Sequence, residues 1–289
     1  MNRRNLLNGA LLGVSALALR PVRLLAAADD PSARIQALEK KHGGRLGVSI
    51  LDTGNGRRVA YRGSERFLMC STFKVLAVSA VLARVDRGAE RLDRRIVFGK
   101  EAVLSYAPVT RLHAGAPGMT IAELCEAAIT VSDNTAANVL LASLGGPESV
   151  TAFVRGLGDA ITRLDRAEPD LNVGSPGDIR DTTTPNAMLA TLQGLLLGNV
   201  LSVISRERLL TWLRATSTGI NRLRAGLPAG WTAGDKTGSG SRTETNDVAI
   251  FFPPQRKPLL VTAYYAGSPA DAATRSAVLA DAGHIAASI

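Results

Sequence analysis

The strand-like segments of this chain stand at its two ends, and a long helical stretch separates them. This is the feature that most restricts its fold. Near the start, "RLGVSILDT" and "RRVAYR" are β-rich runs joined by the turn-forming "GNG". Near the end, "WTAGDKTGSG", "TNDVAIFFPP" and "PLLVTAYYAG" are short β-rich runs bounded by Gly and Pro. Because strands need paired neighbours, we expect the two ends of the chain to meet in one sheet.

Helical patterns occupy the remainder. "PSARIQALEKK" places Ile35 and Leu38 at helical spacing, and "PADAATRSAVLADAGHIAAS" closes the chain as an Ala-rich helix. We predict an α/β fold with a mostly antiparallel sheet, flanked by the N- and C-terminal helices, and an all-helical lobe inserted in the middle of the chain. The predicted domains share a cleft at their junction and comprise residues 29–66 with 215–289 (the α/β lobe) and 67–214 (the helical lobe).

The first 28 residues have the composition of an export signal. A basic start precedes an apolar run from Leu6 to Leu19, and three alanines precede an acidic pair. The apolar run is too short and too interrupted to span a membrane stably. The segment "RRNLL" resembles a twin-arginine signal, with an ordinary secretory signal as the alternative. We therefore expect an exported protein, periplasmic or secreted, with no membrane attachment after the signal is removed.

The charge of the chain gives no indication of a nucleic-acid partner. The formal net charge of +9 includes four arginines within residues 1–28, which contain no Asp or Glu, so a mature chain carries +5. The remaining arginines are scattered, and aromatic residues make up only 4% of the chain. A nucleic-acid interface needs a clustered basic face. We expect none here.

Ser71 and Lys74 lie three residues apart at the head of an almost unbroken apolar run, "KVLAVSAVLA". On a helix this spacing puts the hydroxyl and the amine on one face, with Ser71 near the positive end of the helix dipole. A serine becomes a nucleophile when a neighbour takes its proton, and a desolvated lysine can do so. A Ser-x-x-Lys match alone is weak, because it arises by chance about once in a chain of this length.

Two further motifs follow along the chain. Ser132-Asp133-Asn134 opens a helical segment, and in isolation it reads as an N-cap. Lys236-Thr237-Gly238 lies in a strand-like run, where small residues let a ligand approach the backbone. The alternative for Lys236 is a solvated lysine that protects a sheet edge against aggregation.

In this order and spacing, the three motifs resemble the Ser-x-x-Lys, Ser-Asp-Asn and Lys-Thr-Gly set of class A β-lactamases and penicillin-binding proteins. The resemblance extends over the whole mature chain. It implies a serine hydrolase that opens the β-lactam ring through an acyl-enzyme and confers antibiotic resistance. It also implies a monomer whose partners are small β-lactam substrates.

A fourth segment, "RLDRAEPDLNVGSPGDIRDTTTP", resembles the Ω-loop of class A enzymes, at about residues 163–181. The resemblance implies that Glu168 activates a deacylating water and that Asn172 holds that water. It also implies a cis Glu168-Pro169 bond, a conformation that only proline makes accessible. Arg166 and Asp181 would form an ion pair across the neck of the loop. The alternative is an acidic surface loop with a turn proline.

The resemblance extends to the other site residues. Ser71, Lys74, Ser132 and Glu168 would be catalytic, and either Lys74 or Glu168 would be the base for acylation. The backbone N–H groups of Ser71 and Ser239 would form the oxyanion hole. Arg222 is preferred to Arg224 and Arg275 as the arginine near the substrate carboxylate. The substrate-binding set that the resemblance implies is Tyr106, Asn134, Arg222, Lys236, Thr237, Gly238 and Ser239.

The two cysteines depart from the family pattern. Counting alone favours one disulfide in an oxidising compartment. In the resembling enzymes, a cysteine at the position of Cys70 is often paired with one just after the Lys-Thr-Gly strand, where Gly240 stands here. The partner of Cys125 would lie early in the helix after Ser71, which contains no cysteine. We therefore predict two free, buried thiols and no disulfide. The missing disulfide at Cys70 argues against strong carbapenem hydrolysis. The sequence "KTGSG" with an unpaired cysteine before the nucleophile is similar to cefotaxime-hydrolysing enzymes, which implies penicillins and cephalosporins as substrates.

The sequence predicts neither a metal nor another cofactor. His42, His113 and His284 share no metal-ligand spacing with one another or with a carboxylate cluster. Two alternatives to a β-lactamase stay open: a cell-wall DD-peptidase and a penicillin sensor that remains acylated. The DD-peptidase would normally lack the Glu168 loop and carry a membrane anchor, and the sensor usually belongs to a larger membrane receptor.

Overall fold

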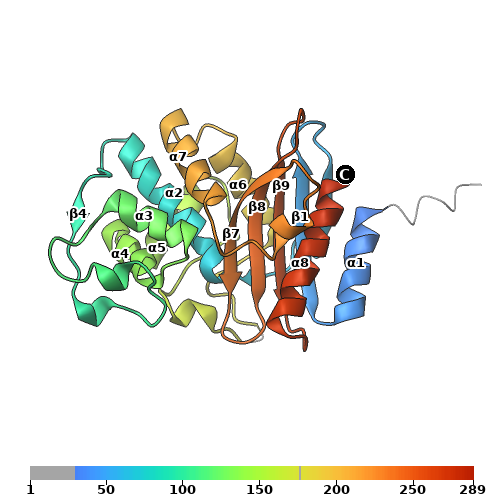
Figure 1. The fold of residues 1–289 in the computed structure, drawn as a ribbon, viewed down its shortest axis with the longest axis horizontal. Helices are drawn as coiled ribbons and strands as arrows, with labels where there is room; N and C mark the ends of the chain where they lie inside the picture. The colour runs from blue at the N-terminus through green and yellow to red at the C-terminus, as the bar shows by residue number, and fades with distance from the viewer. Residues whose placement is uncertain (1–29, 176) are drawn as a thin grey trace, which may run out of the picture.

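The two ends of the chain pair in one antiparallel sheet (Figure 1). The computed structural model describes residues 30–175 and 177–289. Within them, the strand order is β2-β1-β9-β8-β7, so strands from the start of the chain pair with strands from its end. The expectation that both ends share one sheet is confirmed. The strands are β1 (Arg45–Asp52), β2 (Arg58–Tyr61), β7 (Thr232–Ser239), β8 (Thr245–Phe252) and β9 (Leu259–Ala266).

Helices cover both faces of this sheet. The terminal helices α1 (Pro31–His42) and α8 (Ala272–Ala287) pack on one face. On the other face, α6 (Pro185–Leu196) contacts β1 and β9, and α7 (Val203–Arg214) contacts β7. A strand covered on both faces buries residues of both faces, and all residues of β9 except the last are buried, which explains why "LLVTAYYA" is an apolar run without alternation.

The helical lobe is built around α2 (Phe73–Asp86), whose residues from Phe73 to Ala83 are all buried. Helix α2 contacts α3 (Ile121–Thr130), α4 (Asn134–Leu144) and α5 (Pro147–Gly156). A helix that is apolar on all sides belongs in the centre of a bundle, and α2 occupies that place. The predicted α/β fold with an inserted helical lobe is therefore confirmed.

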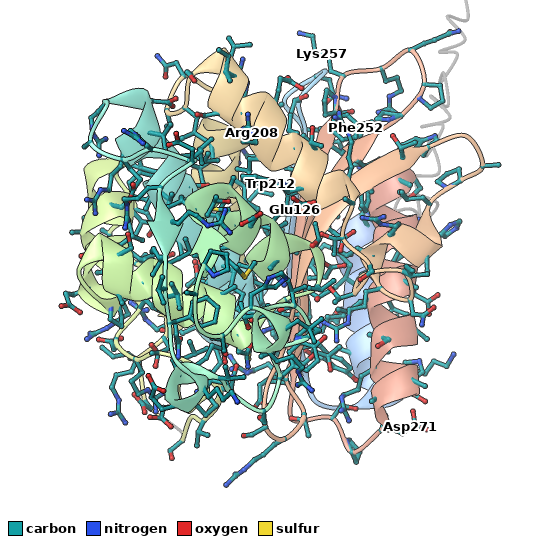
Figure 2. The ribbon with its side chains drawn as sticks, turned by 60° about the vertical axis from the view of Figure 1, so that its left-hand side comes forward. Glu126, Arg208, Trp212, Phe252, Lys257 and Asp271 are labelled. Carbon is teal, nitrogen blue, oxygen red and sulfur yellow. The ribbon has the colours of Figure 1, made fainter. Side chains whose placement is uncertain are left out.

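Helix α7 joins the helical lobe to the sheet. It contacts α3 on one side and β7 on the other. Figure 2 shows Arg208 and Trp212 of α7 on the same side as Glu126 of α3, while Phe252 lies at the end of β8. Trp212 is buried in the same hydrophobic core as Leu124 and Val248, which come from α3 and β8. This core extends from the lobe onto the sheet.

Two small sheets were beyond sequence prediction, because each strand has only two residues. In one of them, β3 (Phe67–Leu68) pairs with β6 (Thr182–Thr183). This pairing ties the segment before Ser71 to the end of the loop that contains Glu168. The other sheet pairs β4 (Arg95–Ile96) with β5 (Met119–Thr120).

The predicted export signal, residues 1–28, lies outside the described residues. Of the helices that the structure does describe, none has the length and apolar character needed to cross a membrane.

Cys70 and Cys125 are both buried and both free thiols in the structure. Burial raises the pKa of both thiols well above the ordinary value. Since the thiolate is the reactive form, we expect neither thiol to react with a disulfide reagent while the protein is folded at neutral pH. After unfolding without reductant, two thiols per chain should react. A count below two would show a disulfide or another modification.

Candidate active site

Ser71 lies in a 3₁₀ turn (Cys70–Thr72) that leads directly into α2. The turn begins with Cys70 at φ 46°, a left-handed conformation that L-residues seldom adopt. Two side chains stabilise the turn: Thr72 Oγ1 donates to Met69 O at 2.8 Å, and Asn246 Nδ2 donates to Leu68 O at 2.9 Å. The nucleophile candidate is thus held against β8 rather than left on a flexible loop.

Lys74, one turn further along, is fully buried. Its Nζ donates to Ser132 O at 2.8 Å and to Asn134 Oδ1 at 2.6 Å. Nζ also lies 3.2 Å from both Ser132 Oγ and Glu168 Oε1. Burial lowers the pKa of Lys74 below its ordinary value, and the charge of Glu168 opposes this effect. Lys74 therefore contacts two potential proton-transfer groups.

In the Ser132-Asp133-Asn134 motif, Asp133 caps the helix, whereas Ser132 belongs to the site. Asp133 is the N-cap of α4: its Oδ1 accepts from Ala136 N at 2.9 Å. Ser132 instead adopts φ 59° and directs its hydroxyl to the site. Asn134 begins the helix and reaches Lys74.

Lys236 lies on β7, the edge strand of the sheet, yet it is fully buried. The alternative of a solvated, protective edge lysine is therefore wrong. Lys236 Nζ donates to Ser132 Oγ at 3.0 Å and to Thr237 O at 2.9 Å. Burial, with the nearby positive charge of Lys74, holds the pKa of Lys236 well below its ordinary value. Both lysines therefore converge on one hydroxyl.

Glu168 faces Ser71 across the site. Its Oε1 accepts from Ser71 Oγ at 3.1 Å, and its Oε2 accepts from Asn172 Nδ2 at 2.5 Å. The Glu168-Pro169 bond is cis, as the sequence predicted. Sequence reasoning missed Asn138, whose amide accepts from Glu168 N at 3.0 Å and donates to Glu168 O at 2.8 Å. The sequence feature that could have identified Asn138 is its position one helical turn after Asn134.

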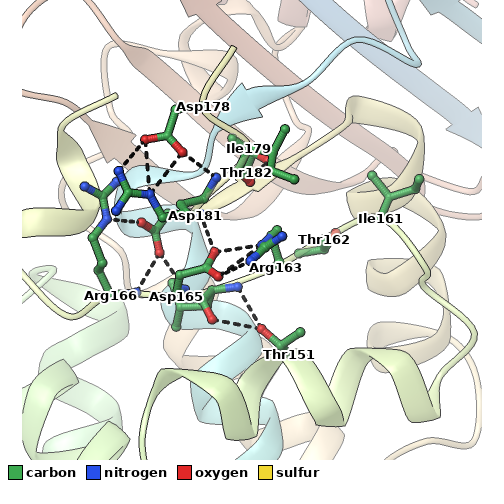
Figure 3. Close-up of polar contacts among 12 residues, drawn as sticks. Thr151, Ile161, Thr162, Arg163, Asp165, Arg166, Asp178, Ile179, Asp181 and Thr182 are labelled. Carbon is green, nitrogen blue, oxygen red and sulfur yellow. Dashed lines mark hydrogen bonds and ion pairs between the residues drawn. The ribbon is translucent and has the colours of Figure 1, made fainter. Parts of the chain in front are cut away.

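The loop of residues 163–181 is closed at its neck by a polar network (Figure 3). Arg166 Nε donates to Asp181 Oδ2 at 2.6 Å, and the side chain of Asp181 is fully buried. The backbone N–H of Asp165 also donates to Asp181 Oδ1, at 2.7 Å, and Asp165 accepts in return from the N–H of Asp181 at 3.0 Å. This reciprocal arrangement fixes the two ends of the loop, and with them Glu168.

A cavity of about 360 Å³ opens directly beside Ser71. Tyr106 is 50% exposed at this cavity, and its hydroxyl donates to Val131 O at 3.2 Å. The cavity brings together residues from both ends and the middle of the chain, and its lining is Ser71, Tyr106, Ser132, Asn134, Asn172, Thr218, Arg222, Thr237 and Ser239.

The structure distinguishes the three candidate arginines. Arg222 Nη2 donates to Ser239 Oγ at 2.7 Å, and its Nη1 donates to Gly238 O at 2.8 Å. Arg224 instead pairs with Asp235, and Arg275 donates to Thr245 Oγ1 at 3.1 Å. Of the three, Arg222 alone lines the described cavity.

Thr218 is a second cavity residue that sequence reasoning missed. Its Oγ1 lies 2.6 Å from Thr237 Oγ1. No motif signals it, because its position depends on how the segment before β7 folds back over the strand.

Comparisons with known proteins agree with this geometry. Residues 30–288 match the β-lactamase enzyme family. The chain is 46% identical to β-lactamase OXY-1 of Klebsiella oxytoca over 278 aligned residues, and this alignment covers 96% of this chain and 95% of that protein. It is 50% identical to β-lactamase AST-1 of Nocardia asteroides over 253 aligned residues, and this alignment covers 88% of this chain and 81% of that protein.

The solved structures give the same result. An ancestral (GNCA) class A β-lactamase superposes with a TM-score of 0.87 at 61% identity, covering 88% of this chain and 98% of that one. The chain therefore belongs to the β-lactamase enzyme family, as a class A enzyme that hydrolyses β-lactams. These relatives are all β-lactamases, so they support neither the DD-peptidase nor the sensor alternative.

Proposed function

We propose that this enzyme hydrolyses penicillins and cephalosporins through an acyl-enzyme on Ser71. The observation that carries the proposal is the hydrogen bond of 3.1 Å from Ser71 Oγ to Glu168 Oε1, beside the cavity of about 360 Å³. The cefotaxime-type substrate range rests on the sequence "KTGSG" and on similarity to β-lactamase CTX-M-8 of Citrobacter amalonaticus, 46% identical over 93% of this chain and 92% of that protein.

Acylation begins when Ser71 Oγ adds to the β-lactam carbonyl and releases its proton. The direct hydrogen bond favours Glu168 as the first acceptor. Lys74 Nζ lies 3.2 Å from both Glu168 Oε1 and Ser132 Oγ, so it can relay a proton between them. As the ring C–N bond breaks, Ser132 delivers a proton to the ring nitrogen. The backbone N–H groups of Ser71 and Ser239 stabilise the developing oxyanion.

In deacylation, Glu168 acts as the base for a water molecule instead of for Ser71. Its carboxylate takes a proton from a water molecule, which attacks the acyl carbonyl. As the bond from the acyl carbon to Ser71 Oγ breaks, Glu168 returns the proton to Ser71 Oγ, which it already contacts at 3.1 Å. Asn172 positions that water. Its Nδ2 donates to Glu168 Oε2, while its buried Oδ1 accepts no hydrogen bond from the described residues and is left as an acceptor. In this role residues 163–181 serve as the Ω-loop, with the Arg166–Asp181 pair holding its neck.

Substrate binding uses the groups along β7 and above it. The substrate carboxylate binds near Lys236, Thr237, Ser239 and Arg222. Asn134 Oδ1 is taken by Lys74, which leaves its Nδ2 to donate to the substrate side-chain amide. Tyr106 lies at the mouth of the cavity, and Gly238 lets the substrate approach the strand backbone.

The proposal also includes the predictions from the sequence on export, partners and domain division. Residues 1–28 direct export, by a twin-arginine signal, to the periplasm or the medium. The mature enzyme acts as a monomer without a nucleic-acid or membrane partner. The catalytic unit has an α/β lobe of residues 29–66 and 215–289 and a helical lobe of residues 67–214. No group of three or more His, Cys, Asp or Glu within residues 30–175 and 177–289 could hold a metal ion.

Time-resolved intact mass spectrometry with excess benzylpenicillin tests the proposal. We expect a small or transient acyl adduct, while product heavier by one water accumulates over many turnovers. Ser71→Ala is the matched control and should form neither adduct nor product. A stoichiometric adduct that persists for hours would contradict hydrolysis and favour a sensor or a transpeptidase.

A further inference from the structure

A second cavity, of about 470 Å³, lies between helices α2 and α5 of the helical lobe and shares no residue with the cavity beside Ser71. Its volume is within the range of roughly 300–1,000 Å³ that is usual for small-molecule sites. Each wall is one face of a helix, because the lining residues recur at helical spacing. These residues are Ala80, Ala83, Arg84 and Arg87 on α2 and its C-cap, and Ser149, Ala152, Phe153 and Gly156 on α5.

The interior of this cavity is apolar and has room for a ligand. On the opposite wall from α2, a Cβ added to Gly156 would meet no atom within 4 Å. Phe153, Leu157 and Val200 line the cavity and are only partly buried, although they pack against the main hydrophobic core. An apolar group placed here would remove their remaining surface from water, which is favourable.

Two arginines give the cavity a positive charge. Arg87 is exposed, and Arg84 is half-buried and donates to Ser143 O at 3.1 Å. Neither arginine forms an ion pair with a carboxylate among the residues that the structure describes. The carboxylate of Asp86, which lies between them in the chain, instead accepts from Ser202 Oγ at 2.6 Å. None of the lining residues is acidic, so an anionic group would be the complementary partner.

We propose that the cavity between α2 and α5 binds an amphiphilic carboxylate, a molecule with one carboxylate group and an apolar chain. The chain lies against Phe153, Leu157 and Val200. The carboxylate accepts hydrogen bonds from Arg84 and Arg87, whose guanidinium groups match it in charge and in geometry. A cationic amphiphile of the same length is repelled by both arginines, so the charge selects the class of ligand.

Helix α5 also connects this cavity to the neck of the Ω-loop. Thr151, next to the cavity residue Ala152, donates from Oγ1 to Leu164 O and accepts from Leu164 N, both at 2.9 Å. Leu164 directly precedes Asp165, which belongs to the neck network (Figure 3). A ligand between α2 and α5 therefore acts on the segment that holds Glu168. We expect it to lower kcat, a consequence that rests on the role of Glu168 in the proposed function.

Calorimetric titration with decanoate tests the binding and needs no turnover. Decanoate should bind at one site per chain. The double variant Arg84→Met/Arg87→Met should bind it about tenfold more weakly, as expected from the loss of two solvent-accessible ion pairs. Arg57→Met, a change of the same kind at an exposed position of the β1–β2 turn, should bind decanoate as the unmodified protein does. Equal affinity for decanoate and decyltrimethylammonium, or no saturable binding of decanoate, would overturn the proposal.

A variant that fills the cavity locates the site. Gly156→Leu places a side chain in the open space and should also weaken decanoate binding by roughly tenfold or more. Ala142→Leu is the control, because Ala142 is exposed on α4 and does not line the cavity. Unchanged binding by Gly156→Leu would show that decanoate binds elsewhere. If this variant does not fold, the arginine variants still decide.

Steady-state hydrolysis of benzylpenicillin near saturation with decanoate tests the coupling to the Ω-loop. In the unmodified enzyme, kcat should fall by roughly 2- to 30-fold, while Arg84→Met/Arg87→Met at the same decanoate concentration should lose less. A rise in KM with kcat unchanged would place decanoate in the cavity beside Ser71 and overturn the proposal. Unchanged kcat and KM at saturation would exclude the coupling. Failure of hydrolysis without decanoate would instead contradict the proposed function and leave the calorimetric result intact.

Discussion

Replacing Glu168 with glutamine is expected to trap the enzyme as its acyl adduct. Glutamine keeps the size of the side chain and can still contact Asn172, but it cannot take a proton from water. Loss of a general base costs roughly 10²–10⁴ in rate, and none of the residues that line the described cavity carries a carboxylate that could replace it. Hydrolysis of benzylpenicillin should fall by that factor, and intact mass should show one adduct per chain.

Acylation should suffer less in this variant. The charge of Glu168 raises the pKa of Lys74, which lies 3.2 Å away, so removing that charge lowers it further. A larger share of Lys74 is then the neutral amine, which can accept the Ser71 proton. Asp170→Asn is the control, because it makes the same kind of change at an exposed position of the same loop. Multiple turnover by Glu168→Gln without an adduct would show that Glu168 is not the deacylating base.

Much of this site could be predicted from the sequence, because its chemistry depends on residues with short, fixed spacing. Ser71 and Lys74 are one helical turn apart, and the Glu168 loop contains its own asparagine and proline. The pairing of the distant strands also followed from their composition. The structure then brings Ser132 and Lys236 to within 3.0 Å, over a separation of 104 residues.

The remainder depends on tertiary packing that a linear pattern does not contain. Asn138 lies next to Glu168 only because α4 packs against the loop. Arg222 and Arg224 are two residues apart, and only the fold directs one to the cavity and the other to a buried aspartate. The burial of Lys236 on an edge strand is of the same kind, because edge lysines are usually solvated.

That burial leads to a second prediction, in which stability and activity change in opposite directions. Lys236 is fully buried, and among the described residues its Nζ donates to a hydroxyl and a carbonyl rather than to a carboxylate. Burying a charge without an ion-pair partner is costly, and replacing buried charges with apolar side chains of similar volume often stabilises a fold by about 1–4 kcal/mol. Lys236→Met should therefore raise the free energy of unfolding by an amount in that range.

The gain should depend on pH in a defined direction. The native pKa of Lys236 is depressed, so between that value and the unfolded value of about 10.4 the unfolded state binds more protons than the native state. Stability of the unmodified enzyme consequently rises with pH through this window. The advantage of Lys236→Met should be largest below the native pKa and should disappear near pH 10–11, where urea unfolding at several pH values can measure it.

Activity should fall in the same variant. A hydrogen bond to a charged group contributes about 1.5–3 kcal/mol, so losing the contact with the substrate carboxylate should lower kcat/KM by roughly 10- to 200-fold. Lys257→Met is the matched control: Lys257 is exposed in the β8–β9 turn (Figure 2), and its replacement should change neither quantity by much. If Lys236→Met destabilised the protein at neutral pH, the ammonium would be a net contributor to the fold. If it kept full activity, the carboxylate would be bound without it, through Arg222 and the hydroxyls of Thr237 and Ser239.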